Sequence, residues 1–260
     1  MFGRSATTST QTVARSVRLV QDPSGRPAVD LSKVREGHVD LAKRADKAGV
    51  ALSKHGLSGI RAQAVLVLDH SGSMKPDYRS GAVQGLVERA LGFALQIDVD
   101  GEVPVIPFDS RVGKTTTVTA ANYQGIVGSG YDGIWRNDAM GSTRLDLALG
   151  AVRKMAEKTD APIFAMVVTD GDPDYGYEQA ATDMVIDLAR YPVFVKFCAL
   201  GNVPYLNELD RLDPSRRLVD NVNTKPFPSL STMTDMQFAE AMADEWESWV
   251  FAARQVGVLL

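Results

Sequence analysis

AVLVLDHSGSM, residues 64–74, places five apolar residues directly before an acid, a histidine, two serines, a glycine and a methionine. A short, wholly apolar run is typical of a strand that is covered on both faces, as in a parallel sheet packed between helices. In such sheets, ligands bind outside the carboxyl ends of the strands. The stretch therefore predicts a layered α/β fold and a functional loop at the end of its first strand.

The same pattern of apolar runs continues from residue 62 onward. Runs at 103–108, 162–168 and 193–200 predict further central strands, while the polar segment 112–119 suits an antiparallel edge strand, and 217–222 is a candidate for the far edge. Amphipathic segments predict helices at 80–97, 144–158, 177–190 and 234–256. We expect a doubly wound, mostly parallel sheet with one antiparallel edge strand and helices on both faces.

Upstream of this domain the composition changes. Residues 1–28 are rich in Ser, Thr, Arg and Gln and predict a mobile tail, although residues 17–20 could form a short strand. Residues 29–59 predict an extension with a helix over 37–55, and short strands built on V-x-L are the alternative. The main domain is expected over residues 60–260.

Composition excludes several classes of function. The net charge is -4 and the 28 basic residues are scattered, so nucleic acid is not an expected partner. Cys198 is the single cysteine, which excludes an internal disulfide and favours a reducing compartment. No run of 18 apolar residues and no signal-like leader occurs, so we expect a cytoplasmic protein without a membrane span, of unknown oligomeric state.

Three loops at the expected carboxyl edge carry oxygen ligands. Asp69, Ser71 and Ser73 follow the first strand, Thr143 opens a helix, and Asp170 follows the strand at 162–168. In an extended segment, residues two apart point to the same side, so Asp69, Ser71 and Ser73 can face one ion while His70 points elsewhere. Carboxylates and hydroxyls without sulfur suit a hard cation, which predicts Mg²⁺, with Mn²⁺ or Ca²⁺ as alternatives.

Simpler interpretations of these motifs remain open. D-x-S-x-S also occurs as an Asx-turn or helix cap, and Asp172 and Asp174 are either additional ligands or solvated loop acids. GKTTT at 113–117 lacks the leading glycine of a phosphate-binding loop, because residue 108 is Phe. The three histidines are isolated in sequence, so a histidine cluster or a catalytic triad has little support. Trp246, Trp249 and Phe251 are expected in the core.

D-x-S-x-S after an apolar strand, followed by GST at 141–143 and TDG at 169–171, resembles the von Willebrand factor A (vWA) family and its metal-ion-dependent adhesion site (MIDAS). KHGLSGIRA at 54–62, LDHSGSM at 68–74 and EWESWVFAARQVG at 245–257 are similar to the vWA domains at the C-terminal end of tellurium-resistance-associated bacterial proteins. The resemblance implies that Ser71 and Ser73 ligate the metal directly, Thr143 directly or through water, and Asp69 and Asp170 mainly through water. Loop 129–142, with Asp132, Trp135 and Arg136, departs from the family pattern.

Two functions follow from these residues. The first is a binding module in which a partner protein supplies a carboxylate to the metal, and the resemblance implies a bacterial stress-response or tellurite-resistance setting. The second is a Mg²⁺-dependent phosphohydrolase with Asp69 as the nucleophile. Such chemistry usually uses a second carboxylate two positions further on, where this chain has Ser71, so we expect a protein that is not an enzyme.

Overall fold

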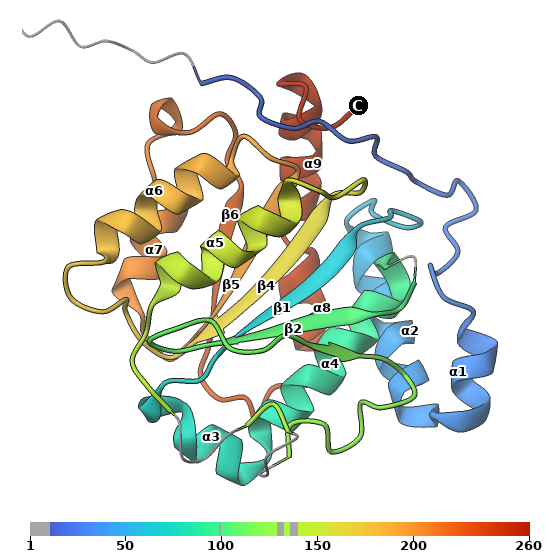
Figure 1. The fold of residues 1–260 in the computed structure, drawn as a ribbon. Coiled ribbons are helices and arrows are strands. Elements are labelled where there is room, and N and C mark those ends of the chain that lie inside the picture. Colours follow the sequence, from blue (N-terminus) through green and yellow to red (C-terminus); the bar gives the residue numbers. More distant parts are fainter. Residues whose placement is uncertain (1–10, 99, 129–132, 136–139) are drawn as a thin grey trace, which may run out of the picture.

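The computed structural model describes residues 11–98, 100–128, 133–135 and 140–260, so Asp132 and Arg136 lie outside the described residues. A twisted sheet forms the middle layer, with α5, α6 and α7 on one face and α4, α8 and α9 on the other (Figure 1). Helices α1 and α2 form an additional layer, in which α2 packs against α4 and α8. The predicted arrangement of helices on both faces is confirmed.

The sheet has the strand order β3-β2-β1-β4-β5-β6. All neighbouring strands are parallel except β2 and β3, which are antiparallel. Chain order reverses beside β1, which lies between β2 and β4, and this is the position where doubly wound sheets bind ligands. The strands are β1 (Gln63–Asp69), β2 (Val103–Phe108), β3 (Thr116–Val118), β4 (Ile163–Thr169), β5 (Val193–Leu200) and β6 (Val222–Phe227).

Strand β1 shows why the central strands are apolar throughout. Val65 and Val67 belong to the core beneath α5 and α6, whereas Leu66 and Leu68 belong to the core beneath α4 and α8. Side chains alternate between the two faces of a strand, so a strand covered on both sides needs apolar residues at every position. The polar sequence that begins at Asp69 therefore marks where β1 leaves the core.

The helices agree with the amphipathic segments, with three short additions, of which α1 precedes the helix predicted over 37–55. Helices α3 and α7, neither of which was predicted, each have a proline in the first turn, where its missing N–H costs nothing. The helices are α1 (Leu31–Gly37), α2 (Val39–Lys54), α3 (Lys75–Ser80), α4 (Ala82–Ile97), α5 (Leu145–Ala156), α6 (Glu178–Leu188), α7 (Pro204–Asp210), α8 (Asp235–Ala243) and α9 (Trp246–Gln255), with 3₁₀ turns η1 (Gly72–Met74) and η2 (Pro214–Arg216).

Three predictions near the C-terminus are wrong. The last strand is Val222–Phe227 and not 217–222. The helix expected over 234–256 is broken between α8 and α9, where Glu245 has a φ of 62°, a left-handed conformation that is uncommon outside glycine. Trp246 and Trp249 are buried as predicted, but Phe251 is 67% exposed and is not part of the core.

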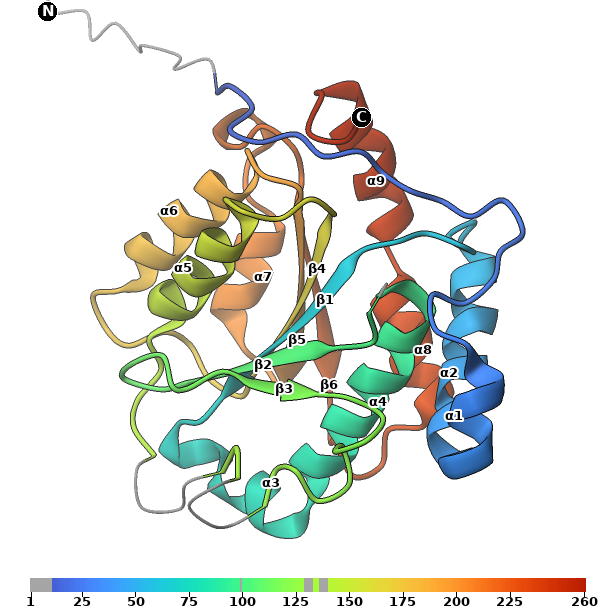
Figure 2. The same ribbon diagram turned by 45° about the vertical axis from the view of Figure 1, so that its right-hand side comes forward.

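Residues 11–22, which the sequence placed in a mobile tail, are packed beside the C-terminus (Figure 2). Val17 forms a parallel bridge with Leu259, and Val17 and Leu19 are both buried. The Leu19 amide donates to the Leu260 carbonyl at 3.1 Å, and the Leu260 amide donates to the Val17 carbonyl at 2.9 Å. Val17 and Leu19 thus cover the hydrophobic core at the end of the sheet opposite the loops that carry the predicted metal ligands.

Within the described ranges we find no helix with the length and apolar content that crossing a bilayer requires.

Candidate metal centre

Asp69 ends β1 with its side chain completely buried. Its Oδ1 accepts a hydrogen bond from the Ser71 amide at 2.7 Å, and its Oδ2 accepts one from the Thr169 hydroxyl at 2.5 Å. The first contact is the Asx-turn that the motif could form by itself. The second contact joins the ends of β1 and β4, 100 residues apart in sequence, which a local turn does not explain.

The two serines connect this buried carboxylate to the surface. The hydroxyls of Ser71 and Ser73 lie 3.0 Å apart, and the Ser73 hydroxyl donates to Asp170 Oδ1 at 2.8 Å. Ser71 is buried, whereas Ser73 is exposed. The structure thus brings four of the five predicted ligands into one hydrogen-bonded cluster that opens to solvent at Ser73 and Asp170. We call Asp69, Ser71, Ser73 and Asp170 the oxygen cluster.

Thr143 reaches the same edge through a different connection. Ser71 and Gly141 form a parallel bridge, and the Gly72 amide donates to the Gly141 carbonyl at 2.9 Å. A Cβ on Gly141 would lie 2.5 Å from the Ser110 hydroxyl and 3.1 Å from the Ser110 amide, so a larger residue would displace the Ser110 side chain at this close approach. Thr143 follows two residues later and is 8% exposed, so it is not the exposed rim residue that a mobile loop would present. In the described residues, no hydrogen bond joins its hydroxyl to the oxygen cluster.

Asp172 and Asp174 have roles that the sequence did not reveal. Asp174 Oδ1 accepts from the Thr143 amide at 2.9 Å, its Oδ2 accepts from the Ser142 hydroxyl at 2.5 Å, and its own amide donates to the Thr143 carbonyl at 2.9 Å. Asp172 Oδ1 accepts from the Tyr205 amide at the start of α7, at 3.1 Å. Neither side chain is simply a solvated loop acid. The loop after β4 binds three other segments through acids at alternate positions: Asp170, Asp172 and Asp174.

His70 points away from the oxygen cluster, as predicted. Its ring lies 3.4 Å from Asp109 Oδ2 and packs edge-on against Tyr78, and Tyr78 donates to the Asp69 carbonyl at 2.9 Å. Trp135 packs on the other side of Tyr78 at a centroid distance of 5.8 Å. These aromatic contacts fix the backbone from which Asp69 projects. Trp135 thereby supports the site, and loop residues 129–132 and 136–139 lie outside the described residues.

The electrostatics of the oxygen cluster suit a cation. Burial raises the pKa of Asp69 to about 6, the hydrogen bonds from Thr169 and Ser71 oppose this shift, and the charge of Asp170 adds to it. Burial and the charge of Asp170 also raise the pKa of Asp77. Among the described residues, no Lys or Arg forms an ion pair with Asp69 or Asp170. A buried carboxylate without a basic partner is costly, and a bound cation would remove this cost.

The ligand chemistry also restricts the type of metal. Among the described residues, no three His, Cys, Asp or Glu side chains converge as a metal cluster, so sites of the zinc-finger or carboxylate-cage type are not supported. Two carboxylates with neighbouring hydroxyls fit a hard, oxygen-preferring cation. The residues present therefore fit the ion that the sequence predicts.

Comparison with known proteins matches the sequence of this chain to a protein family. The family model described as "vWA found in TerF C terminus" matches residues 61–259. Uncharacterized protein YcbR of Bacillus subtilis (strain 168) is 28% identical over 229 residues, which is 85% of this chain and 90% of that protein. The sequence resemblance and the sheet architecture thus agree with an independent family match.

Solved structures resemble the chain at the level of the fold. The von Willebrand factor type A structure from Catenulispora acidiphila matches with a TM-score of 0.51 and 15% identity, over 71% of this chain and 42% of that one. A structure of proximal thread matrix protein 1 from the mussel byssus, described with a zinc-occupied MIDAS motif, matches with a TM-score of 0.43 and 19% identity over 70% of this chain and 47% of that one. This chain spans less than half the length of either structure. Because the family model covers nearly the whole domain from the strand before DHSGSM to the C-terminus, the chain belongs to the vWA family found at the TerF C terminus.

Proposed function

We propose that this chain is a metal-dependent protein-binding module, in which Mg²⁺ at the oxygen cluster binds a carboxylate of a partner protein. The observation that carries the proposal is the hydrogen-bonded cluster of two carboxylates and two serines at the carboxyl edge of the sheet, in which no Lys or Arg of the described residues pairs with either carboxylate. Ser71 and Ser73 would hold the ion directly, Asp69 and Asp170 mainly through water, and Thr143 directly or through water. Mn²⁺ and Ca²⁺ are alternative ions of the same hard class.

An open coordination position is the basis for binding a partner. Neutral hydroxyls leave the charge of a divalent cation incompletely balanced, so an anionic ligand from another protein is favoured. The exposed position of Ser73 supports access for such a ligand. A cytoplasmic location, expected from the sequence composition, and a bacterial stress-response or tellurite-resistance role, implied by the family resemblance, are also part of the proposal.

We favour binding over catalysis at this site. A phosphohydrolase would use Asp69 as its nucleophile, but Asp69 is fully buried and both of its carboxylate oxygens accept hydrogen bonds. Position 71, where a general acid would be needed, is a serine that lies against Ser73. These contacts favour a role in holding an ion.

The experiment compares partner capture from the native host in Mg²⁺ and in EDTA, using wild type and Thr143→Ala. We expect Mg²⁺-dependent capture that Thr143→Ala weakens about tenfold or more, while its melting temperature changes little. Thr115→Ala, at an exposed position before β3, is the matched control. Full capture by Thr143→Ala, or equal capture in EDTA, would contradict the proposal.

A further inference from the structure

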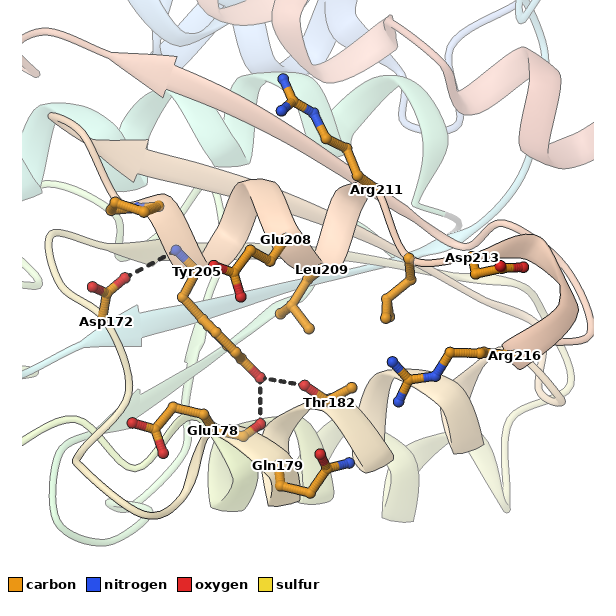
Figure 3. A pocket seen from close by; sticks show the side chains of 12 residues that line it. Asp172, Glu178, Gln179, Thr182, Tyr205, Glu208, Leu209, Arg211, Asp213 and Arg216 are labelled. Atoms are coloured by element: carbon orange, nitrogen blue, oxygen red, sulfur yellow. Dashed lines mark hydrogen bonds between the residues drawn. The ribbon is translucent and has the colours of Figure 1, made fainter. Parts of the chain in front are cut away.

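A groove of about 580 Å³ lies between α6 and α7 and extends to the segment 211–216 (Figure 3). Its floor includes Tyr205 and the buried side chains of Leu209 and Leu212. The Tyr205 hydroxyl donates to the Glu178 carbonyl at 2.5 Å and lies 2.8 Å from the Thr182 hydroxyl. Because the polar end of the tyrosine is already bonded within the protein, the floor offers an apolar surface to a ligand.

One end of the groove lies close along the chain to the proposed metal centre. Asp172, which lines one end, is only two residues after Asp170 of the oxygen cluster. Its hydrogen bond to the Tyr205 amide fixes this loop against the first turn of α7. Two residues of extended chain cover about 7 Å, so a segment bound at the ion needs only a few residues to enter the groove.

The two ends of the groove differ in charge. Figure 3 shows Asp172, Glu178 and Glu208 toward one end and Asp213 and Arg216 at the other, and Arg211 at the end of α7 also lines the groove. Among the described residues, none of the three acids at the first end has a Lys, Arg or His within ion-pair distance. Burial raises the pKa of Tyr205, and the nearby charges of Glu178 and Glu208 contribute to the shift.

These features select one kind of occupant. Three acids without ion pairs favour a cation, and the apolar floor suits the long aliphatic part of a lysine or arginine side chain. If the partner carries a basic side chain close to its metal-bound carboxylate, that side chain would balance the negative charge at the acidic end of the groove. A partner segment with acidic residues alone would meet Asp172, Glu178 and Glu208 with like charge, which disfavours it.

We propose that the groove between α6 and α7 binds a lysine or arginine of the same extended partner segment whose acidic side chain completes the metal centre. This inference rests on the proposed function and names the partner class: a segment that presents an acidic residue and, a few residues away, a basic one. The metal binds the acidic residue of the partner, and the groove selects partners that carry a basic residue nearby.

The test uses defined peptides and the full chain in Mg²⁺. Capped Gly/Ser peptides carry one Asp and one Lys separated by one to six residues, and matched peptides replace Asp with Asn or Lys with Gln. Binding is followed by amide chemical shifts of ¹⁵N-labelled protein, read at Ser73 for the metal centre and at Gln179 and Tyr205 for the groove. The proteins are wild type, Glu178→Gln/Glu208→Gln, and the control Glu36→Gln/Glu102→Gln, which removes two exposed acids elsewhere.

We expect the Asp–Lys peptides to shift both sets of amides, with one separation preferred. Loss of Lys, or the Glu178→Gln/Glu208→Gln change, should weaken affinity about fivefold, as expected for partly exposed ion pairs, while the control double variant binds as wild type does. Equal affinity of the Lys and Gln peptides would overturn the groove assignment and leave the metal centre supported. Groove shifts that are identical for the Asp and Asn peptides would overturn the shared segment. If no peptide binds in a Mg²⁺-dependent way, the proposed function itself fails.

Discussion

At the scale of single residues, the site depends on acids placed at alternate positions in TDGDPD. Asp170 contacts Ser73, Asp172 contacts the start of α7, and Asp174 contacts residues 142 and 143. Each carboxylate satisfies a donor on a different segment, so a single loop fixes the relative positions of three others. The oxygen cluster is therefore held in place before any ion binds.

The residues of the oxygen cluster could be predicted from the sequence, but the residues that hold the surrounding loops in position could not. Asp69, Ser71, Ser73 and Asp170 could be grouped from sequence because each follows an apolar strand, and parallel strands end at one edge. The contacts of Asp172 and Asp174 join loops 33 and 31 residues apart. No local pattern encodes which amide a loop acid will meet, so these roles appear only once the loops are placed.

Asp174 provides a prediction at this scale. Asp174→Ala removes the acceptor for the Thr143 amide and the Ser142 hydroxyl, so the loop that carries Thr143 is no longer fixed. We expect Mg²⁺ affinity to fall about tenfold, as for other residues that orient metal ligands, and the free energy of unfolding to fall by about 1 kcal/mol. Calorimetry and urea unfolding measure the two effects. The exposed Asp40→Ala serves as the control, and unchanged Mg²⁺ affinity in Asp174→Ala would show that Asp174 does not position the site.

At the scale of secondary structure, apolar strands were easier to predict than the last strand and the last helix. β2 and β5 have the predicted bounds because every position is apolar or faces the core. β6, VNTKPF, buries Asn223 and Thr224, which a hydrophobicity pattern does not detect, and tertiary hydrogen bonds from Lys196 and to the Leu206 carbonyl allow their burial. The sequence 234–256 contains no Gly or Pro to mark the break at Glu245.

The break between α8 and α9 depends on a buried lysine. Lys196 of β5 is completely buried, and its Nζ donates to the Asp244 carbonyl at 2.6 Å and also to Asn223 Oδ1. The Asp244 carbonyl lies at the C-terminal cap of α8, where helix carbonyls lack partners within the helix. A lysine in a central strand thus explains why the helix stops here, although nothing near residue 244 predicts it.

This lysine makes stability depend on pH. Burial lowers the pKa of Lys196 from 10.5 to about 7, with the charge of Asp244 opposing the shift. Between pH 7 and 8.5 the unfolded chain keeps a proton that the folded chain loses, so stability should rise with pH by up to about 1.4 kcal/mol per unit from this group. Lys196→Met should remove that rise. Urea unfolding of both proteins at pH 7 and 8.5 is the measurement, and parallel pH dependences would exclude the lysine as the cause.

At the scale of the whole molecule, the two hydrophobic cores that pack against the sheet do not include the residues of the oxygen cluster. The core beneath α4 and α8 includes aromatic contacts of Phe164 with Phe93, Phe194 and Trp246. The packed segment 11–22 adds Val17 and Leu19 at the opposite edge of the sheet. The oxygen cluster lies outside these cores, unlike the metal of a zinc finger, whose binding supplies the folding free energy.

We therefore expect EDTA to leave the fold intact. Loss of an ion present at about 100 times its dissociation constant removes about 2.7 kcal/mol of stabilisation, which corresponds to less than about 10 °C in melting temperature for a domain of this size. Circular dichroism of the protein with Mg²⁺ and with EDTA is the measurement. Unfolding at 25 °C on removal of the ion would show that the metal is structural.

The most direct test of the central claim is a calorimetric titration of Mg²⁺ into the metal-free chain, for wild type, Asp69→Ala, Asp170→Ala and the control Asp40→Ala. We predict one bound ion for wild type and for Asp40→Ala. Asp69→Ala removes the buried carboxylate without a basic partner, and Asp170→Ala removes the acceptor for Ser73, so both should lose most of the binding heat. Equal heats for wild type and Asp69→Ala, with all four proteins folded, would contradict the assignment of the oxygen cluster as the metal centre.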